Sequence, residues 1–205
     1  MNQKIILFAS GNGSNAENIF RFFEKNNNVD VLTVYTNNSK ARVINRFKPL
    51  GINVEVFNRK SFISGSLLKN VINQNPDLII LAGFLWKFGS DWIEAFNKKI
   101  VNIHPSLLPK YGGIGMYGDN VYKAVKENCE SETGITIHYI NEFYDEGAII
   151  FQEKVKLDKY DNLEDISYKT QKLEHKYFPK VIKDLLRGSI KWKLNQFIYI
   201  QMAPH

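Results

Sequence analysis

Cysteine is nearly absent from this sequence, since Cys129 is the only one among 205 residues. No disulfide can form within the chain, and we expect a protein of the reducing cytoplasm. Long apolar runs are also missing. The longest, Leu78–Trp86, covers nine residues, whereas a membrane-spanning helix needs about 20. The N-terminal apolar segment Ile5–Ala9 is too short for a signal peptide, so we expect neither a membrane partner nor export.

Runs of one charge sign are missing as well, although the net charge is +6 and the isoelectric point is about 9.2. Lysine and arginine residues are spread along the chain and nowhere form the basic cluster that is typical of nucleic-acid-binding segments. We therefore expect no nucleic-acid partner and interpret the lysines as a solvated surface. The positive excess favours anionic small-molecule substrates.

Patterns of metal ligands are also absent. The histidines stand far apart and form neither a His-Glu-x-x-His motif nor a cluster with cysteine: His104, His138, His175 and His205. We expect no metal cofactor. His138 alternates with Ile137 and Tyr139, so we interpret it as a packed, hydrogen-bonded histidine rather than as a catalytic one.

Short apolar runs alternate with amphipathic stretches along the chain. The patterns predict strands over 4–9, 30–36, 53–57, 77–82 and 100–103, and helices over 14–25, 40–50 and 62–74. This order predicts an α/β fold with a doubly wound, mostly parallel, Rossmann-like sheet. Later we expect a helix over 116–126, a partly antiparallel strand pair over 133–140 and 148–155, and a long C-terminal helix over 161–188 with a kink or break at Pro179.

A glycine-rich turn separates the first predicted strand from the first predicted helix: Gly11-Asn12-Gly13-Ser14-Asn15. Glycines let the backbone approach a ligand closely, and the start of a helix presents free N–H groups to an anion. The turn therefore predicts a phosphate site, with a plain tight turn as the alternative. A dinucleotide site is disfavoured because no acidic residue ends the second predicted strand.

An amide and an imidazole mark the end of the strand at 100–103. Asn102 and His104 are two residues apart, so their side chains point the same way on an extended backbone. Pro105 and Pro109 end the strand and stiffen the segment after it. An amide beside an imidazole is suited to stabilising an oxyanion while a proton moves. Both residues are therefore candidate catalytic groups.

A carboxylate lies in the turn between the last two predicted strands. Asp145 follows Tyr144 in the segment Asn141–Gly147, and an aspartate in a turn usually serves the turn itself. A carboxylate that returns to the carboxyl edge of the sheet would meet His104 and orient its ring. We therefore add Asp145 to the candidate catalytic residues.

Together the three motifs resemble the glycinamide ribonucleotide (GAR) transformylase family, the folate-dependent phosphoribosylglycinamide formyltransferases of purine synthesis. The match runs from Lys4 to about Gly188. The block Asn102–Pro109 is shared by many folate formyltransferases, whereas the Gly-Asn-Gly-Ser-Asn loop points to the GAR enzymes. Four shorter segments add to the resemblance: Leu81–Phe84, Tyr144–Gly147, Leu173–His175 and Tyr177–Pro179.

The resemblance implies roles for individual residues. Asn102, His104 and Asp145 would be catalytic. The substrate phosphate would be bound by Gly11, Asn12, Gly13, Ser14 and Asn15, and the ribonucleotide also by Glu174. Folate would be bound by Arg59, Leu85, Trp86, Lys87, Phe88, Asn102, Asn141 and Tyr144. The chain departs from many members at Trp86, where they have arginine, and at Gly112–Tyr117, where they have Pro-Gly-Leu-His after Lys-Tyr.

The implied reaction transfers the formyl group of 10-formyltetrahydrofolate, a co-substrate, to the amine of GAR without a metal. We expect residues 1–205 to form a single domain, with a nucleotide-binding half over about 1–100 and a folate-binding, catalytic half over about 101–190. The expected partners are small molecules only, for a cytoplasmic monomer or homodimer. Two alternatives stay open: a formyltransferase for another amine, such as a nucleotide-linked amino sugar, and a non-catalytic Rossmann-like nucleotide-binding module. Methionyl-tRNA as the acceptor is disfavoured, because those enzymes typically carry an additional C-terminal domain.

Overall fold

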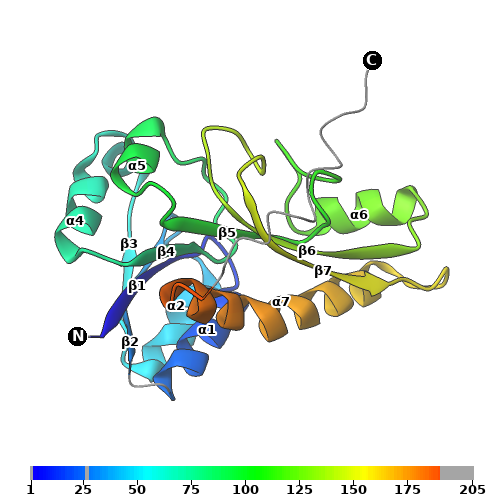
Figure 1. Cartoon of the computed structure of the whole chain (residues 1–205), viewed down its shortest axis with the longest axis horizontal. Coiled ribbons are helices and arrows are strands. Elements are labelled where there is room, and N and C mark those ends of the chain that lie inside the picture. The colour runs from blue at the N-terminus through cyan, green and yellow to red at the C-terminus, as the bar shows by residue number, and fades with distance from the viewer. Residues whose placement is uncertain (1, 26–27, 190–205) are drawn as a thin grey trace.

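A mixed β-sheet forms the centre of the molecule (Figure 1). The computed structural model describes residues 2–25 and 28–189. Within them, seven strands form one sheet in the order β3-β2-β1-β4-β5-β6-β7. The last residues of the expected single domain, among them His205, lie outside the described part of the chain.

The strands divide into a parallel and an antiparallel part. The parallel strands are β1 (Gln3–Phe8), β2 (Val29–Thr36), β3 (Val54–Val56), β4 (Leu78–Leu81) and β5 (Ile100–His104). Two strands continue the sheet in antiparallel pairing, β6 (Glu132–Tyr139) and β7 (Ile149–Lys156). The predicted doubly wound sheet with an antiparallel C-terminal strand region is therefore confirmed.

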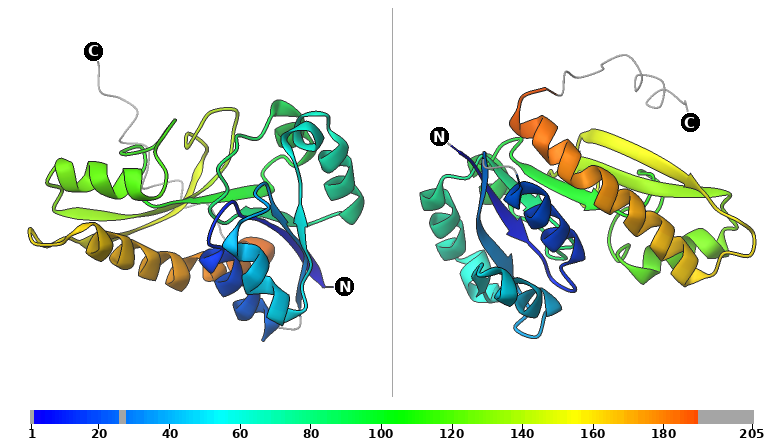
Figure 2. Two further views of the ribbon diagram at one scale, coloured as in Figure 1. Left: turned by 180° about the vertical axis from the view of Figure 1, so that it is seen from behind. Right: turned by 90° about the horizontal axis from the view of Figure 1, so that it is seen from below.

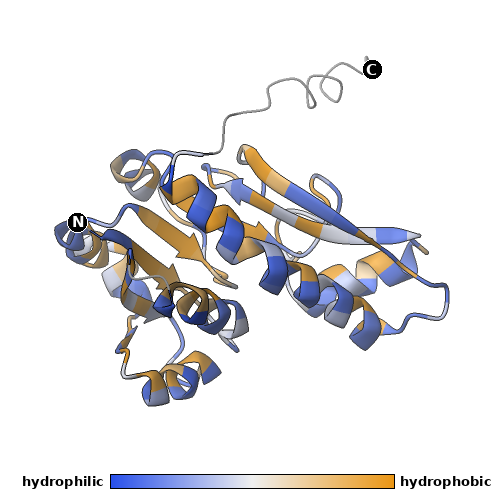
Figure 3. Cartoon of the chain, turned by 60° about the horizontal axis from the view of Figure 1, so that its bottom comes forward, coloured by the Kyte–Doolittle hydropathy of each residue, from blue (hydrophilic) through white to orange (hydrophobic). Residues whose placement is uncertain are grey.

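Two layers of helices cover the two faces of the sheet, because the central strands are apolar on both sides. One face packs against α1 (Ser14–Glu24), α2 (Arg42–Phe47) and α7 (Leu163–Leu186), and Ile5 and Leu7 of β1 point to it. The other face carries Ile6 and Phe8 and packs against α3 (Arg59–Ile63), α4 (Ser66–Gln74) and α5 (Ser90–Ala95). Figure 2 shows α7 crossing the sheet beside α1, and Figure 3 shows apolar strands between helices with polar outer faces.

Several helix boundaries differ from those that the sequence predicts. The helix expected over 62–74 is two helices, α3 and α4, separated at Ser64–Gly65, and the one over 40–50 is α2 followed by a 3₁₀ turn at Lys48–Leu50. The helix expected from residue 116 begins three residues later as α6 (Asp119–Glu127), because Gly115 and Gly118 have positive φ angles. The short helix α5 was not predicted.

Pro179 lies inside α7 without breaking it. Proline has no N–H group, so the carbonyl of His175, four residues earlier, has no helical partner. Asn18 of α1 takes its place, and its Nδ2 donates a hydrogen bond of 2.9 Å to that carbonyl. Of the kink or break expected at Pro179, the break is wrong, because a side chain from a distant segment supplies the missing donor. The same bond joins α1 to α7.

The tie between Asn18 and His175 predicts a stability effect that depends on Pro179. Asn18→Ala leaves the carbonyl without a partner and should cost about 1–3 kcal/mol of unfolding free energy, measured by urea denaturation. In a Pro179→Ala background the restored N–H of residue 179 bonds the carbonyl, so the same substitution should cost much less. Equal losses in the two backgrounds would contradict this account of the proline.

Candidate functional site

The site is centred on the end of β5, where the strand pairing sets the order of side chains. Asn102 and His104 lie on the same face of β5, as the sequence predicts. In the antiparallel pairing with β6, Asn102 is opposite His138 and His104 is opposite Thr136. Opposed residues of two strands project from the same face of a sheet. The register therefore brings His138 beside the two predicted side chains.

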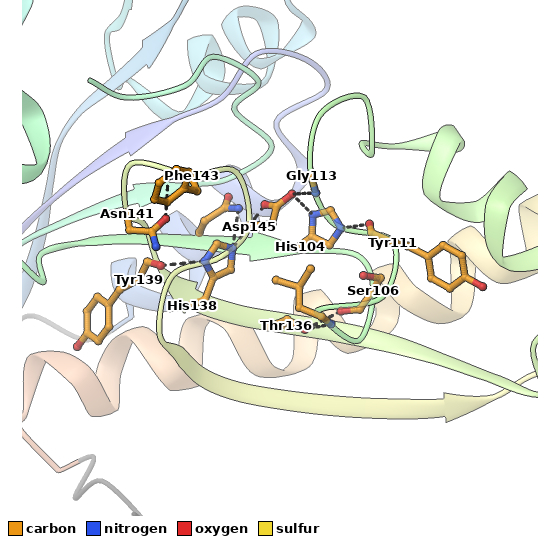
Figure 4. Close-up of polar contacts among 12 residues, drawn as sticks. His104, Ser106, Tyr111, Gly113, Thr136, His138, Tyr139, Asn141, Phe143 and Asp145 are labelled. Atoms are coloured by element: carbon orange, nitrogen blue, oxygen red, sulfur yellow. Dashed lines mark hydrogen bonds and ion pairs between the residues drawn. The ribbon is translucent and has the colours of Figure 1, made fainter. Parts of the chain in front are cut away.

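Asp145 lies between the two imidazoles (Figure 4). Its Oδ2 is 3.5 Å from Nδ1 of His104, and its Oδ1 is 3.7 Å from Nε2 of His138. The backbone N–H of Gly113 donates a 3.0 Å hydrogen bond to Oδ2. The side chain is only 11% exposed. The loop after β6 thus folds back and buries one carboxylate against both histidines.

The protons of His104 follow from its neighbours. Its Nε2 lies 2.7 Å from the backbone carbonyl of Tyr111, and because a carbonyl only accepts hydrogen bonds, Nε2 carries a proton. A neutral ring would then leave a bare Nδ1 facing the carboxylate of Asp145. The protonated ring presents an N–H to that carboxylate instead. Only a protonated ring can present an N–H both to the Tyr111 carbonyl and to Asp145 in this geometry.

His138 has the opposite arrangement. Its Nδ1 lies 2.9 Å from the backbone carbonyl of Tyr139 and so carries the proton, which leaves Nε2 to accept from Nδ2 of Asn102 at 3.1 Å. Burial lowers the pKa of His138, although its backbone hydrogen bond and the charge of Asp145 oppose this. A neutral His138 fixes the Asn102 amide and leaves the second N–H of that amide for a ligand.

The expectation that His138 is packed and hydrogen-bonded agrees with this structure. Contact with Asn102 and Asp145 was not predicted, because it depends on the β5–β6 register. The sequence gives little indication of this contact, because a long connection separates the strand of Asn102 from the strand of His138.

A buried polar network holds the segment that follows His104. The hydroxyl of Thr136 donates to the Ser106 carbonyl at 2.7 Å and accepts from the backbone N–H of Leu108 at 2.9 Å. It also accepts from Nε2 of Gln152 at 2.9 Å. Side chains of β6 and β7 therefore fix the backbone at Ser106 and Leu108, which keeps the adjacent imidazole of His104 in place.

A pocket of about 550 Å³ opens over these groups. Asn102, His104 and Asp145 line it, as do most residues predicted to bind folate: Leu85, Trp86, Lys87, Phe88, Asn141 and Tyr144. Arg59 is not among the lining residues; its guanidinium lies 4.9 Å from the ring centre of Trp86. The glycine-rich loop over residues 113–118 also lines the pocket. This role was not predicted, because residues 116–118 were assigned to a helix.

The other end of the pocket joins the glycine turn to α7. Asn15 and Glu174 both line it, and Nδ2 of Asn15 donates a 2.8 Å hydrogen bond to Oε2 of Glu174. Burial raises the pKa of Glu174 to about 7, against the opposing effect of that hydrogen bond. The structure therefore brings together two predicted ribonucleotide-binding residues that are far apart in the sequence.

The rest of the glycine turn lies beside Asn15 rather than in the pocket lining, and comprises Gly11, Asn12, Gly13 and Ser14. Gly13 precedes the first residue of α1 with a φ of 74°, and a Cβ there would come within 2.5 Å of Cγ2 of Val43. Because no side chain caps α1, its first N–H groups are open to an anion.

Two negative findings apply to residues 2–25 and 28–189. In that part of the chain, no group of three or more histidine, cysteine, aspartate and glutamate side chains is placed to hold a metal ion. None of the helices in those ranges is both long enough and apolar enough to cross a membrane.

Comparisons by family model, by sequence and by structure all match this chain to formyltransferases. The family model described as Formyl transferase matches residues 3–182. Phosphoribosylglycinamide formyltransferase of Bacillus subtilis is 38% identical over 190 residues, which are 90% of this chain and 95% of that protein. The enzyme of the same name from Haemophilus influenzae is 33% identical, over 94% of this chain and 92% of its own. The crystal structure of phosphoribosylglycinamide formyltransferase from Bacillus halodurans matches with a TM-score of 0.81 and 31% identity, over 91% of this chain and 97% of that one.

The arrangement around Asp145 predicts an effect on the titration of His138. A carboxylate stabilises the protonated ring only, so Asp145→Asn should lower the pKa of His138 further below its ordinary value of 6.5. Ring ¹⁵N NMR across pH measures this and also reports the proton on Nδ1. His175 is the matched control, because burial lowers its pKa too without contact to Asp145. An unchanged or higher pKa for His138 would contradict the placement of the carboxylate.

Proposed function

This chain belongs to the formyl transferase family, and on that premise we propose that it transfers the formyl group of 10-formyltetrahydrofolate to the primary amine of glycinamide ribonucleotide in purine biosynthesis. The shared name of relatives that align over nearly their whole length supports this activity. We place the reaction in the cytoplasm, with small molecules as the only substrates.

The observation that carries the proposal is the position of Asp145 between two imidazoles, beside Asn102 and in the lining of the pocket. Acyl transfer to an amine needs two things from a protein. One is a set of donors for the oxygen that becomes negative in the tetrahedral intermediate. The other is a route for the proton that the amine loses. The side chains at the end of β5 supply both.

In the proposed mechanism the amine attacks the formyl carbon directly. The free N–H of the Asn102 amide and the protonated His104 stabilise the oxyanion. Asp145 keeps His104 charged and, through water, helps to move the proton released by the amine. When the intermediate collapses, the bond from carbon to N10 breaks and N10 of tetrahydrofolate receives a proton. His138 takes no part in proton transfer and holds the Asn102 amide.

We propose that the two substrates enter from opposite ends of the pocket. The phosphate of the ribonucleotide binds at the start of α1 on Gly11, Asn12, Gly13, Ser14 and Asn15, and Glu174 accepts hydrogen bonds from the same substrate. The folate ring lies between two segments, Leu85–Phe88 and Asn141–Tyr144, with Arg59 and Trp86 at the outer end. In this proposal the nucleotide-binding half, residues 1–100, and the catalytic half, residues 101–190, form one domain around the pocket.

An acceptor panel tests this function. The purified protein is incubated with 10-formyltetrahydrofolate and, in separate reactions, with glycinamide ribonucleotide, a nucleotide-linked amino sugar or buffer alone. Formyl transfer to the ribonucleotide should exceed transfer to the sugar by orders of magnitude. Faster formylation of the sugar would reassign the acceptor, and no transfer to either amine would refute the proposal.

His104 is expected to be indispensable for turnover and dispensable for folding. His104→Ala removes the positive charge proposed to stabilise the oxyanion, so kcat at saturation of both substrates should fall by roughly 10²–10³-fold. Circular dichroism and the melting temperature verify that the variant is folded. A folded variant that retained about a third of the wild-type kcat would remove His104 from the mechanism.

A further inference from the structure

Arg46 of α2 donates to three acceptor atoms in the segment that opens α1. Its Nε donates to the backbone carbonyl of Asn12 at 2.7 Å, and its Nη2 donates to Oδ1 of the same residue at 3.0 Å. Its Nη1 lies 2.5 Å from Oε2 of Glu17. A single guanidinium thus holds both oxygens of one residue in the glycine turn and a carboxylate in the first helical turn.

The contact with Asn12 matters because a phosphate is surrounded by oxygens that repel other acceptors. The backbone N–H of Val43 also reaches the turn, donating to the Gly11 carbonyl at 3.1 Å. Helix α2 thus binds the carbonyl oxygens of Gly11 and Asn12 from one side. With these acceptors held, the turn offers backbone N–H groups to a phosphate on its other side.

The contact with Glu17 matters because a carboxylate in the first turn of α1 opposes an anion at the same helix end. Burial would raise the pKa of Glu17, but hydrogen bonds and charge from Arg21 and Arg46 outweigh it and hold the pKa below its ordinary value. Glu17 is therefore ionised at neutral pH. Its two oxygens are shared between the arginines, Arg21 at 2.9 Å from Oε1 and Arg46 on Oε2.

We propose that Arg46 is a positioning residue for the ribonucleotide phosphate, acting through Asn12 and Glu17. The inference rests on the proposed function in so far as the phosphate belongs to that substrate. Arg46 orients the turn for a phosphate monoester and cancels the nearest negative charge. Loss of Arg46 weakens phosphate binding and leaves the chemistry at His104 intact. The formyl group reacts beside His104, at the opposite end of the pocket from the glycine turn.

Arg21 provides a matched control for Arg46. Both arginines pair with Glu17, but in the described residues only Arg46 also binds Asn12. Arg46→Gln should raise KM for the ribonucleotide by about 10- to 100-fold, with kcat and the KM for folate within about twofold of wild type. Arg21→Gln should raise the same KM by less than about threefold, as expected for an exposed pair. Equal effects of the two substitutions would overturn the proposal.

A binding measurement separates this inference from the proposed function. Ribose 5-phosphate is titrated calorimetrically into wild type, Arg46→Gln and Arg46→Lys, without folate and without turnover. Arg46→Lys keeps the charge near Glu17 and loses the forked contact with Asn12, so its affinity should lie between the other two. Weakened binding in this order supports the role of Arg46 even if the acceptor assay fails. Wild-type affinity for ribose 5-phosphate in both variants overturns it.

Discussion

Burial of one carboxylate between two imidazoles is the constraint on which the rest of this structure depends. A buried charge is tolerated only when hydrogen bonds and an opposite charge compensate its lost hydration. Asp145 obtains these from the Gly113 N–H and from His104. The loop after β6 must therefore return to β5, and the glycine-rich segment must lie close by. The antiparallel register of β5 and β6 fixes which side chains meet there.

The parts of the fold that local patterns determine were predictable, and the parts that depend on distant contacts were not. Short apolar runs predict the strands, and the spacing of Asn102 and His104 alone places both on one face. The continuity of α7 through Pro179 depends on Asn18, which is more than 150 residues away in the chain. For the same reason, neither the contact of His138 with Asn102 nor that of Arg46 with Asn12 is visible before strands and helices are assembled.

The site also shows why a division into two halves is only approximate. The glycine turn comes from the first half of the chain, and its partner Glu174 comes from α7 near the end. The segment Leu85–Phe88 precedes β5, whereas Asn141 and Tyr144 follow β6 across the same pocket. Each proposed substrate would therefore contact both halves. A pocket built in this way forms only when the sheet and α7 are both in place, which couples binding to the integrity of the whole fold.

The proline in α7 also has an evolutionary consequence. Asn18 supplies the donor that residue 179 lacks, so the two positions constrain each other's history. A lineage that acquires the asparagine first can later accept the proline at little cost, whereas the reverse order passes through an intermediate with an unsatisfied carbonyl. Once both are present, the asparagine can be lost at little cost only after the proline has been replaced. Positions 18 and 179 are thus expected to change together among descendants of this sequence, although neither residue lines the pocket.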